Sequence, residues 1–117
     1  MTRETGFPSP AQGYEATPIN LNDELIKNKE STFILSLEES SLKKYGVLDN
    51  SILIVDRSIK PRDGDIVVAL VEGEFICRIF YKKGGRQGVS NGEFVLLATG
   101  EVEIFGTVTY VIKKVHK

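Results

Sequence analysis

One stretch decides the fold of this chain: residues 51–80, which read SILIVDRSIKPRDGDIVVALVEGEFICRIF. Within it, Ser51–Asp56 and Asp65–Val71 are short apolar runs rich in β-branched residues, and each predicts a strand. Lys60–Gly64 supplies the turn between them, because proline presets φ and glycine accepts a positive φ. A third strand, Glu74–Lys82, follows almost at once. Strands this close together leave no room for a crossover helix, so we expect an antiparallel β core.

The third predicted strand contains an unusual cation. Glu72-Gly73 makes a tight connection into this strand, which therefore forms a hairpin with the second one. Alternation places Arg78 between Ile76 and Phe80 on one face of the strand. The other face then carries Phe75, Cys77 and Ile79. Because arginine does not lose its charge inside proteins, two large apolar neighbours are an odd setting for it.

Composition bounds the remaining possibilities. A length of 117 residues fits one domain with a modest core, and 41% hydrophobic with 26% charged residues describes an ordinary globular protein. The net charge of −1 gives no global attraction to nucleic acid, so we expect no direct DNA binding. The single Cys77 excludes an internal disulfide and is expected to pack inside its strand. No apolar run approaches a membrane span or a signal peptide, so we expect no membrane association and a cytoplasmic location.

The N-terminal part of the chain differs from the rest. Residues 1–18 hold three of the four prolines and little that can pack, so they are expected to form an extended or disordered arm. Residues 19–117 are expected to form a single β domain. One short helix is predicted over Asn20–Lys27, because an asparagine can cap it and acidic residues fill its first turn.

Further short elements complete the predicted fold. Thr32–Leu37 alternates as a strand does, and Glu38–Tyr45, closed by Gly46, favours a single helical turn. The remaining predictions are a loop at Lys82–Asn91, a strand at Glu93–Ala98 and a strand at Glu101–Lys114, with a bulge or bend at Gly106. About six short antiparallel strands with one short N-terminal helix indicate a mostly-β sandwich or a partly closed barrel.

Residue types alone suggest little chemistry. His116 lies beside the C-terminus, where a solvated side chain is favoured over a catalytic base. No Cys/His cluster offers a metal site, and no cofactor is expected. Gly84-Gly85 lacks the strand–loop–helix context of a phosphate-binding loop and predicts a hairpin tip. The basic residues around this pair, Lys82, Lys83 and Arg86, are interpreted as a solvated loop in preference to a nucleic-acid contact.

Four motifs together carry a resemblance to a known family. They are Gly6–Ala11 (GFPSPA), Leu53–Ser58 (LIVDRS), Gly64–Ala69 (GDIVVA) and Gly73–Phe75 (GEF). Their order and spacing resemble the UmuD/MucA-like branch of the LexA-like family of self-cleaving serine peptidases, from Gly6 to Val108. The resemblance implies the LexA/UmuD-like β fold for the domain.

The resemblance also implies a site. In this family a serine in a Ser-Gly-Asp-Ser-Met motif is the nucleophile, and a buried, neutral lysine on a later strand deprotonates it. The motif falls on Glu38–Leu42 (EESSL), which keeps Ser41 at the nucleophile position, and the lysine position falls on Arg78. An arginine cannot accept the serine proton. The resemblance therefore implies a degenerate peptidase in which Ser41 is vestigial and Arg78 is not a base.

The charge of Arg78 also needs a partner, because an unpaired buried guanidinium is costly. Glu38 and Glu39 stand in the short motif expected to face that strand. We predict that Arg78 either pairs with Glu38 or Glu39 or donates to the Ser41 hydroxyl. An Arg78 side chain that reaches solvent along its apolar stem is the competing interpretation.

The N-terminal motif fits the same picture. UmuD-like proteins cut themselves just before the Gly-Phe-Pro-Ser-Pro run, and here Thr5-Gly6 occupies that junction close behind Met1. The chain is therefore expected to resemble the processed form, for which cleavage is unnecessary. By resemblance, it is a homodimeric accessory subunit that partners a UmuC-like error-prone polymerase in SOS translesion synthesis after DNA damage.

Two alternatives stay open. The chain is interpreted secondly as a decoy or regulator that heterodimerises with a UmuD protein or a LexA-type repressor and alters its cleavage, which a RecA filament stimulates in this family. An active serine peptidase is the third and least favoured interpretation, because it requires a base that Arg78 does not supply.

Overall fold

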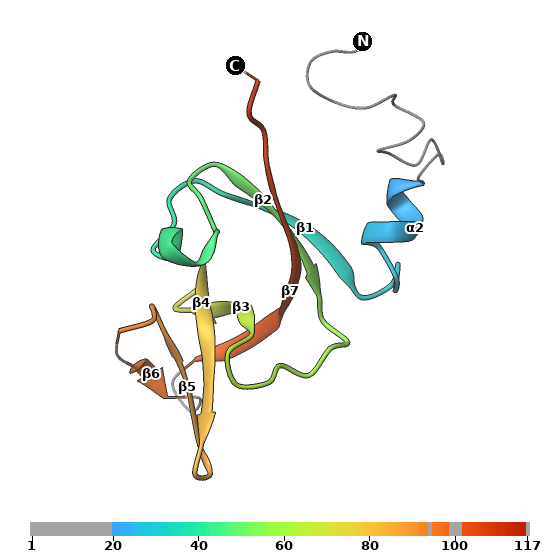
Figure 1. The fold of residues 1–117 in the computed structure, drawn as a ribbon. Coiled ribbons are helices and arrows are strands. Elements are labelled where there is room, and N and C mark those ends of the chain that lie inside the picture. Colours follow the sequence, from blue (N-terminus) through green and yellow to red (C-terminus); the bar gives the residue numbers. More distant parts are fainter. Residues whose placement is uncertain (1–19, 94, 99–101, 117) are drawn as a thin grey trace, which may run out of the picture.

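The computed structural model describes residues 20–93, 95–98 and 102–116. The predicted arm at residues 1–18 and the junction at Thr5-Gly6 lie outside these residues. Within the described residues, seven strands form one sheet in the order β1-β2-β7-β3-β4-β5-β6 (Figure 1). In chain order the elements are α2 (Leu21–Leu25), β1 (Thr32–Leu37), the 3₁₀ helix η1 (Lys43–Tyr45), β2 (Ser51–Asp56), β3 (Ile66–Val71), β4 (Glu74–Lys83), β5 (Arg86–Ser90), β6 (Val95–Ala98) and β7 (Glu103–Lys113).

The predicted fold class is confirmed. All six strand pairings in the described residues are antiparallel, and one short helix precedes them. The sheet is not a closed barrel, because β1 and β6 stand at its two ends. No helix in the described part of the chain is long and apolar enough to cross a membrane.

The predicted loop at Lys82–Asn91 is wrong, because this segment contains β5. Gly84 and Gly85 both adopt positive φ, at 56° and 78°, and make the two-residue turn of a hairpin. This turn sets Lys83 opposite Arg86 and continues β4 into β5. The sequence pattern does not indicate strand β5, because the glycines and charged residues of this segment hide the strand alternation.

The short helix forms where its capping residue predicts. The Asn20 side chain accepts hydrogen bonds from the backbone N–H groups of Asn22 and Asp23, which have no partner inside the helix. Acidic Asp23 and Glu24 occupy the first turn, where the helix dipole favours negative charge. The Tyr110 hydroxyl donates to the Glu24 carboxylate at 2.9 Å, which joins the helix to β7.

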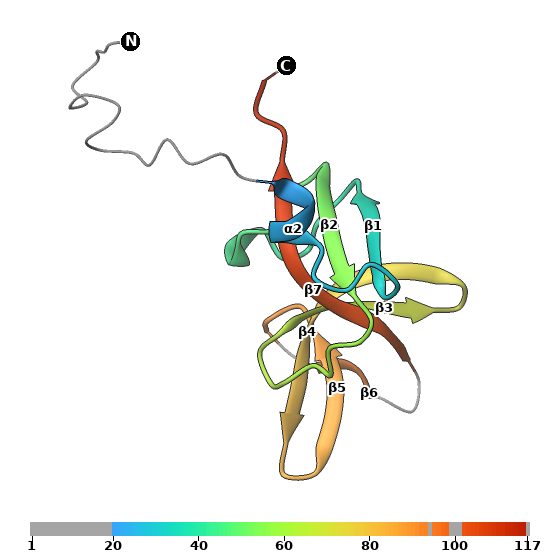
Figure 2. The same ribbon diagram turned by 90° about the vertical axis from the view of Figure 1, so that its right-hand side faces the viewer.

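Strand β7 connects the two parts of the sheet. Its first half pairs with β3 and its second half with β2 (Figure 2). The register shifts in both ladders, which leaves Phe105 unpaired opposite β3 and Thr109 unpaired opposite β2. The bend predicted at Gly106 is therefore confirmed by a bulge at its neighbour. A Cβ atom at Gly106 would lie 2.6 Å from Cγ1 of Val55, so the packing at this bend requires glycine.

Strand β3 is buried on both faces. Val68 belongs to one core cluster with Leu53, Val55 and Cys77, and with Leu42 and Val47 from the loop after β1. Val67 and Ala69 belong to a second cluster, with Phe80, Val89 and Val102. The alternation predicted for β4 is confirmed, since Cys77 faces the first cluster and Phe80 the second.

A buried carboxylate fixes the end of β2. Asp56 is 4% exposed, and its oxygens accept hydrogen bonds from the side chains of Asn28, Ser31 and Ser58 and from the Ser58 backbone. Burial alone raises the pKa of Asp56, but these four donors outweigh it and lower the pKa to about 2. The network ties the segment between α2 and β1 to the end of β2.

We expect Asp56 to make stability depend on pH. Its folded-state pKa of about 2 lies below the ordinary 3.8, so its contribution is complete above pH 3.8 and is lost as pH falls through about 2. The shift corresponds to roughly 2 kcal/mol. In Asp56→Asn, urea unfolding between pH 2 and 5 should lose this part of the pH dependence. The exposed Asp23→Asn variant is the control, and equal slopes in Asp56→Asn and the parent protein would contradict the expectation.

Candidate functional site

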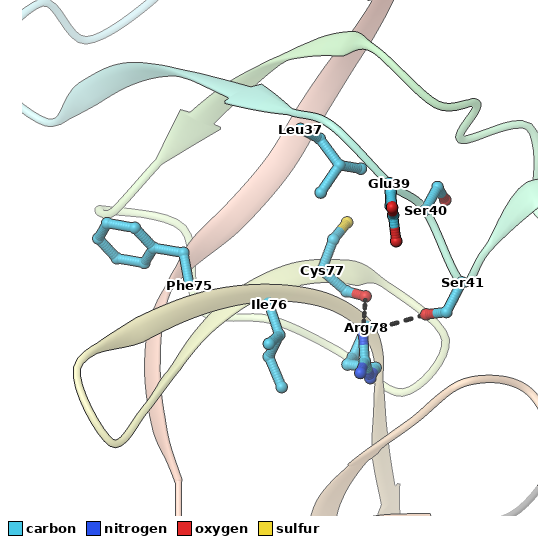
Figure 3. Close-up of a pocket in the computed structure, with 8 residues that line it drawn as sticks. All are labelled: Leu37, Glu39, Ser40, Ser41, Phe75, Ile76, Cys77 and Arg78. Atoms are coloured by element: carbon cyan, nitrogen blue, oxygen red, sulfur yellow. Dashed lines mark hydrogen bonds between the residues drawn. The ribbon is translucent and has the colours of Figure 1, made fainter.

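A pocket of about 310 Å³ lies between the end of β1, with the loop that follows it, and the first half of β4 (Figure 3). It brings Ser41 and Arg78 together, although 37 residues separate them in the sequence. The complete lining is Leu37, Glu39, Ser40, Ser41, Phe75, Ile76, Cys77 and Arg78.

The loop that carries Ser41 is held by its neighbours. Leu42 is fully buried in the first core cluster, while Ser41 itself is exposed at the pocket. The Leu42 backbone N–H donates to the Ser40 hydroxyl at 2.9 Å, and the Ser40 backbone N–H donates to Asp49 at 2.8 Å. The burial of Leu42 and these two bonds fix the position of the Ser41 hydroxyl.

Asp49 helps to hold the Ser41 loop, a role that its place in the sequence does not indicate. The Ser40 N–H and the Lys43 ammonium, 3.1 Å away, lower the pKa of Asp49 below its usual value. Lys43 opens the short 3₁₀ helix predicted within Glu38–Tyr45, which Gly46 closes at φ 89°. In the sequence, Asp49 looks like a turn residue before β2, and no local pattern connects it to Ser40.

The guanidinium of Arg78 is aimed at Ser41. Its Nη1 atom donates to the Ser41 hydroxyl at 3.0 Å and to the Cys77 carbonyl at 2.9 Å. Each bond uses a donor of a group that stays protonated in proteins. The arrangement therefore positions the hydroxyl of Ser41, but Arg78 cannot take its proton.

The two glutamates, Glu38 and Glu39, differ from Ser41 in their contacts with Arg78. Both are exposed, and Glu39 lines the pocket. Among the described residues, no ion pair joins Arg78 to Glu38 or Glu39, so the contact that forms is the predicted alternative with Ser41. Exposed carboxylates keep their hydration, and an ion pair in such a setting is worth little. The Nε atom of Arg78 is buried and has no hydrogen-bond partner in the part of the chain that the structure describes.

Cys77 is a packing residue, as the sequence predicts. Its side chain is 3% exposed and lies in the first core cluster. Burial raises the pKa of its thiol to about 11, although the nearby Arg78 charge acts in the opposite direction. The thiolate is the reactive form of cysteine, so Cys77 is not a nucleophile at neutral pH.

The edge of β4 is open beside the pocket. β3 pairs with Glu74–Ile79 on one side, but β5 pairs only from Ile79 onward on the other. Among the described residues, this edge is therefore open over Glu74–Arg78, which includes the four β4 residues of the pocket. A strand edge of this kind leaves backbone donors and acceptors available at the pocket.

Comparisons with known proteins define the class. A family model described as Peptidase S24-like matches residues 3–109. Protein ImpA of Salmonella typhimurium is 36% identical over 117 residues, covering 97% of this chain and 81% of that protein. Protein MucA of Escherichia coli is 34% identical over 110 residues, covering 90% and 75%. The LexA repressor of Leptospira biflexa is 28% identical over 92 residues, covering 71% and 46%.

The chain therefore belongs to the Peptidase S24-like family. ImpA, MucA and SamA of Salmonella typhimurium, the last also 36% identical, are the relatives that support its UmuD-like character. The resemblance found in the sequence is thereby confirmed.

We expect the Arg78–Ser41 contact to contribute measurably to stability. Arg78→Ala should lower the free energy of unfolding by about 1 to 2 kcal/mol, and Ser41→Ala by about 0.5 kcal/mol, because each removes one side of a half-exposed hydrogen bond. The double variant should show a coupling of about 0.5 kcal/mol in urea unfolding. Arg62→Ala, an exposed arginine without a side-chain contact to Ser41, is the control; strictly additive effects of Arg78→Ala and Ser41→Ala would contradict the contact.

Proposed function

We propose that this chain is a catalytically inactive UmuD-like accessory subunit, which acts in the cytoplasm as a homodimer with a UmuC-like error-prone polymerase. Its role is in SOS translesion synthesis. One observation carries the proposal: the group beside the Ser41 hydroxyl, where the resemblance places the lysine base, is the guanidinium of Arg78.

The loss of activity follows from acid–base chemistry. A serine nucleophile needs an adjacent base that accepts its proton, and a lysine can act when burial makes it neutral. A guanidinium stays protonated inside proteins even when it is half-buried, as that of Arg78 is. The pocket contains Ser41, but the proton of Ser41 has no acceptor in Arg78.

An apolar sheet face supports a role in assembly. On the outer side of β1, β2 and β7, Ile34, Ile52, Tyr110 and Ile112 are between 37% and 60% exposed. The register sets Ile52 opposite Ile112, and it sets the buried Ile54 opposite both Ile34 and Tyr110, so the four exposed side chains lie on one face of the sheet around Ile54. We propose this outer face, defined by Ile34, Ile52, Tyr110 and Ile112, as part of the dimer or polymerase interface.

A second candidate function rests on the similarity to a LexA repressor. In this alternative the chain heterodimerises with a UmuD protein or a LexA-type repressor through the same outer face and alters its cleavage. The two candidate functions differ in the partner that the chain binds, and in both of them the peptidase site is inactive.

We expect no peptidase activity. Incubation with a UmuD-like substrate and a RecA filament should give no cleavage, and Ser41→Ala should behave as the parent does, because the serine has no base. A cleavage-competent UmuD-like protein with its lysine is the positive control. Cleavage by the parent that disappears in Ser41→Ala would overturn the proposal of inactivity.

We expect the chain to sediment as a dimer at micromolar concentration and to copurify with a UmuC-like polymerase. Ile52→Lys should weaken the dimer at least about tenfold, because it places a charge in an apolar interface. Ile59→Lys is the matched control, since both isoleucines are 40% exposed and Ile59 lies outside the outer face. A folded parent protein that remains monomeric would contradict the accessory-subunit model, and copurification of a LexA-type repressor instead of a polymerase would favour the second candidate.

A further inference from the structure

We propose that the tip of the β4–β5 hairpin, residues 82–86, binds the phosphate groups of nucleic acid. The tip consists of Lys82, Lys83, Gly84, Gly85 and Arg86, and every one of these residues is exposed. The proposal stands apart from the peptidase site and does not depend on whether that site is active.

The tip is a narrow ribbon that projects from the body of the protein. Figure 1 and Figure 2 both show the β4–β5 hairpin extending away from the rest of the sheet. Lys82 pairs with Gln87 and Lys83 with Arg86, so the ribbon is two strands wide up to its turn. A two-stranded ribbon fits against a nucleic-acid backbone or into the major groove of a duplex.

The arrangement of charges at the turn is unfavourable without a ligand. Lys83 and Arg86 are directly opposite each other across the hairpin. Like charges in this position destabilise a strand pair. Among the described residues, no carboxylate forms an ion pair with Lys82, Lys83 or Arg86. A local arrangement that weakens the fold is expected where a function requires it, and a bound anion would remove the repulsion.

The nearest acidic side chains do not neutralise the tip. Asp63 accepts a hydrogen bond from the Lys82 backbone N–H at 2.8 Å, and Asp65 accepts one from the Arg62 backbone N–H at 2.8 Å. Their loop, residues 60–65, also carries Lys60 and Arg62, so its two carboxylates are balanced by two cations. The Asp63 carboxylate binds the backbone of the tip at Lys82 and forms no ion pair with the three cations of the tip among the described residues.

The chemistry of the tip favours phosphate over an acidic protein surface. Residues 82–87 read KKGGRQ and contain no apolar side chain. Protein interfaces depend on a buried apolar or aromatic core, which this tip does not offer. Contacts between cations and phosphates need no such core and do not depend on base sequence. The overall charge of −1 predicts no direct DNA binding by the chain as a whole. A net charge does not show where charges lie, however, and three cations are clustered at this tip.

The experiment measures fluorescence anisotropy of a labelled twenty-nucleotide oligo-dT, and of a duplex of equal length, with the full chain at 20–200 mM NaCl. The parent should bind oligo-dT with an affinity that falls as salt rises. Lys83→Gln/Arg86→Gln should weaken binding at least about fivefold at 20 mM NaCl. It should also reduce the slope of log K against log salt by about 1.4, because each phosphate contact on single strands contributes about 0.7.

Lys29→Gln/Lys114→Gln is the matched control, since it removes the same charge from two exposed lysines outside the hairpin. It should bind within twofold of the parent. Absence of binding by the parent at 20 mM NaCl would overturn the proposal. So would a Lys83→Gln/Arg86→Gln variant that binds as the parent does, or tighter binding to a poly-glutamate chain of equal charge than to oligo-dT.

A second readout excludes misfolding as the cause of lost binding. Because Lys83 and Arg86 repel each other, Lys83→Gln/Arg86→Gln should unfold at the same temperature as the parent or a higher one at low salt. Adding oligo-dT should raise the unfolding temperature of the parent more than that of this variant. A variant that unfolds at a clearly lower temperature than the parent would contradict the repulsion on which the proposal rests.

Discussion

The structure depends on one constraint: strand β7 must pair with both β3 and β2. Eleven residues pair with β3 over one half and with β2 over the other, and two bulges give the strand the bend that this requires. Gly106 lies against the Val55 side chain at the first bend, where a larger residue has no room. Because β2 leads back to β1 and β3 leads on to β4, the bend of β7 decides how the Ser41 loop meets the strand that carries Arg78.

That placement explains how the pocket lined by Arg78 is held in position. Leu42 and Val47 are fully buried on either side of the 3₁₀ helix, so the Ser41 loop is fixed by the core. Arg78 lies on β4, where it pairs with Val67 of the buried strand β3 and lines the pocket. Its guanidinium is satisfied in part by Ser41 and Cys77, while its Nε atom has no partner.

Much of this was accessible from the sequence, and the failures have physical causes. Residues 51–80 predicted three strands because apolar runs and turn residues agree there, and the alternation of β4 correctly set Arg78 and Cys77 on opposite faces. β5 was missed because RQGVS has no apolar period and its pairing depends on a glycine turn. Asp49 was missed because its partner, the Ser40 N–H, becomes visible only when the loop is folded. The choice between Ser41 and the two glutamates was open in the sequence, since all three side chains are exposed and only the folded loop places the Ser41 hydroxyl 3.0 Å from Arg78.

The bond from Arg78 to the Cys77 carbonyl bears on whether strands of other molecules can pair with the β4 edge. Beside the pocket, no strand in the described part of the chain pairs with β4 on one side, and such open edges allow strands of other molecules to add to the sheet. The guanidinium occupies one acceptor on this edge and places a permanent charge beside it. Proteins commonly use charged side chains to blunt exposed edges in this way. Arg78 thus leaves this edge less suited to pairing with a strand of another molecule.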